Sequence, residues 1–403
     1  MALKLKITEH SIGFFLLTTG ATLNYVFDGI NKLGKIYDPA FSRSAILYRL
    51  LLELVSISVI CIFFNKKRMN WLILFAYFLS CFIAGNLYLK YAIGIDVFLI
   101  EQFVYFNKYF FIFFIFFATY KTIENKDSLQ RIIKNFKKIF LFNGYIAIIG
   151  LLFKIKIFST FPIGTPRFGY DGLLLSQNEA SIFYLLGMFI YYYDWKVKKK
   201  SFKHLFFILF ICLLTGMKAV FLGVSLLVIF HFLSKITLKK IIYLILGLTI
   251  SITTLVLSFS KLKVIFGYYY WFFTTKGFLY SILGGRNTFI KSRIIPYIEK
   301  MDIINYILGG QNISNINNYL ALVEMDFVDL FLFFGVLNGF VFLYVYKTHI
   351  IGVIKSKFFY FVVSVFFLQS FFSGHFFTSS VNPIYIIIVF AYINTRINDK
   401  AVY

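Results

Sequence analysis

Residues 98–119 read FLIEQFVYFNKYFFIFFIFFAT, a long apolar run that carries only two charges, Glu101 and Lys108. An α-helix needs about 20 predominantly apolar residues to cross the hydrocarbon core of a bilayer, so this segment predicts a transmembrane helix. Charged side chains at that depth must face the interior of a helix bundle or water. We therefore expect Glu101 and Lys108 to face neighbouring helices rather than lipid.

The composition of the whole chain agrees with a membrane protein. Of its 403 residues, 60% are hydrophobic and 14% are charged, a balance that a water-soluble domain could not cover with polar surface. The net charge of +24 could indicate a nucleic-acid partner, but Lys and Arg lie in short clusters between apolar runs rather than along one face. We therefore expect an all-α polytopic membrane protein that does not bind nucleic acid.

The cysteines give no sign of a disulfide framework or a metal site. Cys61, Cys81 and Cys212 all lie inside apolar segments, where they resemble small buried side chains. Their spacing matches no metal-binding pattern. We therefore expect neither a metal nor another cofactor.

The chain predicts about twelve transmembrane helices within a single membrane domain, residues 1–403. The N-terminal segment has a basic start and an apolar stretch but no small-x-small cleavage site, so it is predicted to remain as the first span. The shortest candidate, about 205–215, crosses only if the turn TGMK at 215–218 lies below the membrane surface, buried in protein or beside water. The other candidate spans lie at about 10–27, 45–64, 71–88, 98–119, 139–153, 176–193, 219–233, 241–260, 326–346, 358–372 and 382–395.

The basic residues between these spans predict the orientation. Loops rich in Lys and Arg remain in the cytoplasm, and every second loop of this chain is basic. Both termini are then cytoplasmic, and two longer loops lie outside: 154–175, and 261–325 between the ninth and tenth helices. Residues 121–138 are predicted to form an amphipathic helix on anionic lipid. Arg49 is predicted to pair with Glu53, one helical turn later.

The large outer loop is the first indication of function. YYYWFFTTKGFLY, at 268–280, is aromatic enough to lie in the membrane interface, or to stack against sugar rings. GGRNTFIKSRIIPYIEKMDIINYILGGQN, at 284–312, places a basic segment between two glycine pairs. We expect the glycine pairs to act as hinges and the basic segment to bind an anion.

The order of these features resembles the Wzy-type O-antigen and capsular polysaccharide polymerases, which share a superfamily with the O-antigen ligases. The resemblance covers about residues 160–385. Where the ligases carry a His before the next helix, this chain has Asn317 and Asn318, which favours a polymerase. The matching features are PRFGYDGLLLSQNEAS at 166–181, TGMK at 215–218, GGR at 284–286 followed by GG at 309–310, and NNYLALVEMDFVDLFLFFG at 317–335.

The resemblance implies a metal-independent glycosyltransferase of the bacterial inner membrane. Such an enzyme joins oligosaccharide repeat units carried on undecaprenyl diphosphate, at the outer face, into O-antigen or capsular polysaccharide. An acceptor hydroxyl attacks the anomeric carbon, and the departing lipid diphosphate develops negative charge that must be neutralised. Arg and Lys would supply the positive charge. The partners implied are the lipid-linked oligosaccharide, membrane lipids and a chain-length regulator protein.

Four basic residues on the outer side are candidates for binding the diphosphate. Arg286 is the foremost, because it lies in the GGR of the resemblance, and we expect it to act in catalysis as well. Arg293, seven residues later, would share a helical face with it. Arg167 follows Pro166 in the second outer loop. Lys218 ends the TGMK turn, where a lysine held at membrane depth is usually functional, unless it extends to the lipid headgroups.

The acceptor proton requires a base, and the sequence offers several candidates. Glu179 and Asp329, each near the start of a predicted helix, are the carboxylates we expect to act in catalysis, with Asp326 as an alternative. Acids at helix N-termini are also favoured by the helix dipole alone, so a structural role stays open. His375, in the last outer loop, is expected to assist catalysis or contact the diphosphate, unless it is an ordinary interfacial His.

Three other functions remain open. An O-antigen ligase or a protein O-oligosaccharyltransferase would use the same donor with another acceptor. A flippase or exporter of lipid-linked oligosaccharide belongs to a different class, in which Glu101 and Lys108 could line a groove for the lipid carrier. Transporters of that kind usually contain two related halves. The chain has no visible internal repeat and its outer loops are unequal, which favours the polymerase.

Overall fold

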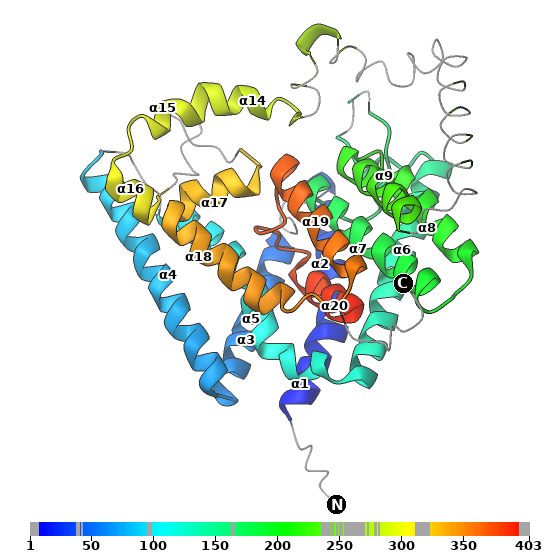
Figure 1. Ribbon diagram of the computed structural model, residues 1–403, viewed down its shortest axis with the longest axis horizontal. Helices are drawn as coiled ribbons and strands as arrows, with labels where there is room; N and C mark the ends of the chain where they lie inside the picture. Colours follow the sequence, from blue (N-terminus) through cyan, green and yellow to red (C-terminus); the bar gives the residue numbers. More distant parts are fainter. Residues whose placement is uncertain are drawn as a thin grey trace, which may run out of the picture.

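The computed structural model describes residues 8–37, 41, 43–94, 99–162, 165, 167–234, 283–310 and 323–394, with a few positions between 235 and 282. Within these ranges the chain is mainly helical and contains no β-strand beyond one isolated bridge between Ser159 and Tyr170. The helices form a bundle (Figure 1). The predicted span 241–260 and most of the aromatic stretch 268–280 lie outside the described residues.

The first half of the chain supplies the longest helices. Four of them, α3 to α6, are long and apolar enough to cross a membrane, which confirms the prediction of an all-α chain with helices of transmembrane length. The number of spans is not settled by helix length. The elements are α1 (Glu9–Phe15), the π-helical turn η1 (Leu16–Gly20), α2 (Ala21–Tyr37), α3 (Ser44–Ile62), α4 (Lys66–Tyr91), α5 (Leu99–Glu124) and α6 (Lys126–Leu152).

The second half contains shorter helices, several of them apolar. In Figure 1, α14 and α15 lie along the top, at the opposite side of the bundle from the N-terminus, and α8 and α9 lie at the right. The elements are η3 (Lys156–Phe158), α7 (Gln177–Lys196), α8 (Phe202–Leu214), α9 (Lys218–Leu233), α14 (Arg286–Phe289), η4 (Ile290–Ile294), α15 (Ile295–Ile298), α16 (Ile303–Leu308), α17 (Asp326–Phe334), α18 (Val336–Tyr346), η5 (Lys347–Ile351), α19 (Lys357–Phe372) and α20 (Pro383–Asn394).

Aromatic packing forms the core of the bundle. Trp71 of α4 is buried and stacks on Phe113 and Phe117 of α5, with ring centroids 4.8 and 5.1 Å apart. Helices in a membrane associate through close packing rather than the hydrophobic effect, so large flat rings are effective there. α20 is buried on nearly every face and lies at the centre of the bundle (Figure 1), as expected for a helix that is apolar all round.

The amphipathic stretch 121–138 does not lie on lipid. Most of it belongs to α6, which runs on without a break into the predicted span 139–153. Its apolar face packs inside the protein, and Ile132 and Phe136 are at most 1% exposed. The predicted lipid contact is therefore wrong, because neighbouring helices already cover this face.

Two predictions about charges in the apolar helices are also corrected. Arg49 does not pair with Glu53: its guanidinium donates to Asp28 Oδ1 of α2 at 2.7 Å, while Glu53 accepts from Asn107 of α5. Arg49 pairs with Asp28 on a neighbouring helix, and this contact also links α3 to α2. Glu101 is exposed, since α5 begins at Leu99 and places it in the first turn.

The predicted span 326–346 is broken into α17 and α18 at Gly335, which has φ of 80°. The end of α16 packs into the break: a Cβ on Gly335 would lie 2.4 Å from the carbonyl oxygen of Ile307. The backbone N–H of Gly310 donates to Phe333 O at 3.1 Å, which satisfies a carbonyl freed by the break. The second glycine pair is therefore a site of close backbone contact rather than a hinge.

Replacing Gly309 tests this contact against a matched control. Gly309 (φ 77°, ψ −149°) and Gly352 (φ 66°, ψ −153°) share a backbone conformation that costs other residues about 1–3 kcal/mol. A Cβ on Gly309 would lie 2.3 Å from Phe333 O, whereas one on Gly352 meets nothing within 4 Å. We expect Gly309→Ala to lose about 1–3 kcal/mol more stability than Gly352→Ala, because only Gly309 is tightly packed. The melting temperature in detergent should therefore fall further for Gly309→Ala than for Gly352→Ala. Equal falls for Gly309→Ala and Gly352→Ala would contradict the packing described.

Candidate functional site

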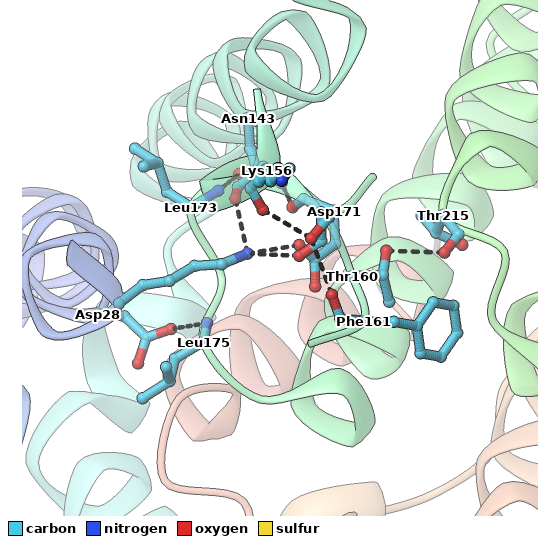
Figure 2. A network of polar contacts seen from close by, with 12 residues as sticks. Asp28, Asn143, Lys156, Thr160, Phe161, Asp171, Leu173, Leu175 and Thr215 are labelled. Atoms are coloured by element: carbon cyan, nitrogen blue, oxygen red, sulfur yellow. Dashed lines mark hydrogen bonds and ion pairs between the residues drawn. The ribbon is translucent and has the colours of Figure 1, made fainter. Parts of the chain in front are cut away.

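The loop between α6 and α7, predicted to be the second outer loop, is anchored to α2 by two carboxylates (Figure 2). Lys32 Nζ donates to Asp171 Oδ1 at 2.6 Å and to the carbonyl of Gly172 at 2.9 Å. Asp28 Oδ2 accepts the backbone N–H of Leu175 at 3.0 Å. Burial raises the pKa of Asp171 to about 6, and the nearby charge of Lys32 opposes the rise.

Asn143 of α6 holds the same loop from its other side. Its amide nitrogen donates to Asp171 O, and its Oδ1 accepts the backbone N–H of Leu173, both at 2.9 Å. Figure 2 shows Asn143 above the loop and Asp28 below it. Gly172, with φ of 77°, is needed at this point because a Cβ there would lie 2.3 Å from Asn143 Oδ1. Side chains of α2 and α6 therefore fix the path of the loop.

Residues 215–217 of the TGMK turn, between α8 and α9, are buried against this loop, while Lys218 at the end of the turn is exposed. Thr160 Oγ1 donates to Thr215 O at 2.8 Å, and the N–H of Tyr170 donates to Leu214 O at 3.0 Å. A Cβ on Gly216 would lie 1.9 Å from the carbonyl oxygen of Phe168. The non-helical backbone of the turn thus finds its partners inside the protein, as a turn below the membrane surface requires.

Three predicted cations lie near enough to this turn for their charges to interact. Lys218 is the first residue of α9, and the positive charges of Arg167 and Arg286 both act on it. Arg167 also lies over the ring of Phe161, 5.2 Å from its centroid. Met217 gives α9 no side-chain cap, so the positive end of the helix dipole adds to the cations. An anion placed here would reduce repulsion among like charges. The side chain of Arg293 lies outside the described residues.

Arg286 links the predicted large outer loop to the end of α19. The αL conformation of Gly285, φ 87°, starts the helical turn that carries it. Its guanidinium donates to the carbonyl oxygens of Phe372 at 3.1 Å and Ser373 at 3.3 Å, and to Glu324 Oε2 at 2.8 Å. The carbonyl contacts hold the arginine in place, and the carboxylate neutralises it.

Glu324 is the main site residue that the sequence reasoning did not single out. Its side chain is 49% exposed, and its backbone has φ of 57°, which is unusual for any residue except glycine. Asn178 Nδ2, in the first turn of α7, lies 3.4 Å from its carboxylate. The available signal was a lone acid within the apolar stretch LALVEM, 320–325.

His375 lies beside this pair and is held by Asp326. The Asp326 carboxylate accepts backbone N–H groups from three successive residues, His375 at 2.7 Å, Phe376 at 2.6 Å and Phe377 at 3.1 Å. His375 itself has φ of 69°, and its Nδ1 lies 3.3 Å from Asn178 Nδ2. Asp326 therefore acts as an anchor for the loop that presents His375.

The other two candidate carboxylates are also engaged with backbone groups. Asp329 accepts the N–H groups of Val323 and Met325 at 2.9 and 3.2 Å. Glu179 accepts the N–H and the hydroxyl of Ser380 at 2.8 and 3.0 Å. Both carboxylates are buried, so these contacts favour the structural role that the sequence left open for acids near helix starts.

Lys108 of α5 faces the same region. The charges of Glu179 and Arg49 act on it, and its ammonium lies 4.2 Å from the ring centroid of Tyr105. Arg49 in turn donates to the hydroxyl of Ser380 at 2.9 Å. The charged groups of the apolar helices thus converge on the loop after α19.

The arrangement combines three cations, an exposed carboxylate and a histidine at the ends of several helices. Such a site can bind an anion through the anion's oxygen atoms, and it can place a proton acceptor beside that anion. Among the described residues there is no group of three or more His, Cys, Asp or Glu that could hold a metal ion. No family model, curated protein or solved structure matches this chain. The residues and geometry of the site are therefore the basis for assigning a function.

Proposed function

We propose that this chain is a bacterial inner-membrane polymerase that joins oligosaccharide repeat units carried on undecaprenyl diphosphate. The observation that supports it most is the convergence of Lys218, Arg167 and Arg286 beside Glu324 and His375. A lipid diphosphate carries several negative charges, and three cations next to the positive end of α9 suit it. The order of the sequence motifs, which resembles the Wzy-type polymerases, favours the same substrate.

The site residues suit the chemistry of glycosyl transfer. The acceptor hydroxyl attacks the anomeric carbon of the donor, and the bond from that carbon to the diphosphate oxygen breaks. Arg286 can grip the departing phosphate with two parallel N–H groups, while Lys218 and Arg167 add positive charge. Preorganised charge of this kind stabilises the transition state because it needs no rearrangement as the leaving group forms.

The proposal includes the orientation of the chain, with about twelve spans, both termini in the cytoplasm and the site at the outer face. The exposed residues Thr165 and Ser201 lie on opposite sides of the membrane in this arrangement. We expect an impermeant thiol reagent to label Thr165→Cys, but not Ser201→Cys, in intact cells after the three native cysteines have been replaced by alanine. Labelling of both variants only after the cells are opened would contradict the orientation.

A strain that lacks the gene separates the candidate functions. Loss of a polymerase leaves surface glycans of one repeat unit, whereas loss of a ligase leaves an undecorated lipid A core with polymer retained on the carrier. Loss of a flippase leaves carrier-bound units facing the cytoplasm. Only the first phenotype agrees with the proposal.

Arg286 variants in that strain test the site. We expect Arg286→Ala to lower polymer formation by about 100-fold or more, because a preorganised charge at the leaving group is lost. Arg286→Lys should recover part of it, since a point charge attracts phosphate without the two-point grip. Lys291→Ala, an exposed cation five residues later, is the matched control and should leave the glycan ladder on a gel unchanged. Long polymer from Arg286→Ala at normal protein levels would contradict the assignment.

A further inference from the structure

The ion pair between Arg286 and Glu324 differs from the other pairs on this side of the molecule. In the pairs Lys32–Asp171 and Arg49–Asp28, the carboxylate is at most 2% exposed. The Glu324 side chain is 49% exposed, and solvent weakens an ion pair with a carboxylate this exposed. Glu324 can therefore leave Arg286 at little cost, whereas the buried pairs stay closed.

The backbone of Glu324 is held in a strained conformation. Its φ of 57° is strained for a residue with a side chain and persists only when the surroundings enforce it. Asp329 enforces it by accepting the N–H groups of Val323 and Met325, the residues on either side. Gly374 lies so close that a Cβ on it would be 2.5 Å from Glu324 O. Strain maintained in this way fixes the backbone from which the Glu324 side chain extends.

We propose that Glu324 neutralises Arg286 in the empty site, is displaced from it by the lipid diphosphate, and then accepts the proton of the acceptor hydroxyl. This inference rests on the proposed function. Two negatively charged groups compete for one guanidinium, and the diphosphate has the advantage of the further cations Arg167 and Lys218. Once Arg286 binds the phosphate, it no longer stabilises the charge of the Glu324 carboxylate. The carboxylate can then accept a proton.

The step balances in atoms and charge. The acceptor O–H bond breaks and its proton passes to a Glu324 carboxylate oxygen, while the hydroxyl oxygen forms a bond to the anomeric carbon. The bond between that carbon and the diphosphate oxygen breaks, and its electron pair leaves with the lipid diphosphate. The protonated Glu324 then loses its proton to water, which restores the carboxylate for the next cycle.

Glu324 suits this role better than the carboxylates predicted from sequence. The oxygens of Asp326 and Asp329 accept backbone N–H groups and are buried, so they cannot turn toward a substrate without breaking the fold. Glu179 is held by Ser380 in the same way. Asn178 contacts both Glu324 and His375, which keeps the carboxylate beside the imidazole once it leaves Arg286.

The test separates binding from turnover. Binding is measured with undecaprenyl diphosphate and the full-length protein in nanodiscs. Turnover is measured as polymer formed in membrane vesicles from the deletion strain carrying each variant. We expect Glu324→Gln to bind the diphosphate about twofold to fivefold more tightly, because a competing charge is gone, and to form polymer about 100-fold or more slowly. Glu324→Asp, which keeps a carboxylate, should restore part of the rate.

Glu299→Gln is the matched control, because it removes an exposed carboxylate from the same loop and should alter neither measurement. Weaker binding together with slower polymerisation by Glu324→Gln would indicate a structural role and overturn the inference. Polymerisation at the normal rate would overturn it as well. If the wild-type protein bound the diphosphate in nanodiscs but formed no polymer in vesicles, the proposed function itself would fail, and the proton-accepting role of Glu324 with it.

Discussion

Backbone N–H and C=O groups that leave a helix inside an apolar bundle must find partners within the protein, because no water is available there. Non-helical segments of this chain meet that requirement by pairing with other parts of the backbone. Thr160 and residues 168–170 cover the turn at 215–217, and the glycine pair at 309–310 fits against the break at Gly335. These contacts bring the loop between α6 and α7, the start of α9 and the segment 283–310 to one side of the bundle. The position of the candidate site therefore follows from the hydrogen bonds and close contacts that the non-helical backbone makes within the protein.

The charged groups on this side divide into two kinds. Buried pairs such as Lys32–Asp171 fix the loops, and their carboxylates are shielded from solvent. Arg286 pairs instead with a half-exposed glutamate, which leaves this cation able to exchange one anion for another. Ion pairs thus form a rigid frame where they are buried and an exchangeable contact where they are exposed to solvent. Lys218 lies in the field of two arginines, so the site as a whole favours an anion.

Helix positions follow from local composition and were largely predictable, because the span 45–64 and the short span 205–215 each depend on a continuous apolar run. The burial of residues 215–217 was also implied by the length of that short span, whereas the exposure of Lys218 was not. The break at Gly335 was not, because it is stabilised by α16, a segment distant in sequence. Glu324 was missed for the same reason: its partner Arg286 is 38 residues away, and no local pattern records that pairing.

The central claim is that a lipid diphosphate binds where Arg167, Lys218 and Arg286 meet. The most direct measurement is a cryo-electron microscopy map of the protein in nanodiscs that contain undecaprenyl diphosphate. The account predicts phosphate oxygens about 3 Å from the Arg286 guanidinium, with Lys218 and Arg167 facing them and Glu324 moved away. A diphosphate bound elsewhere, with Arg286 still paired to Glu324, would contradict it.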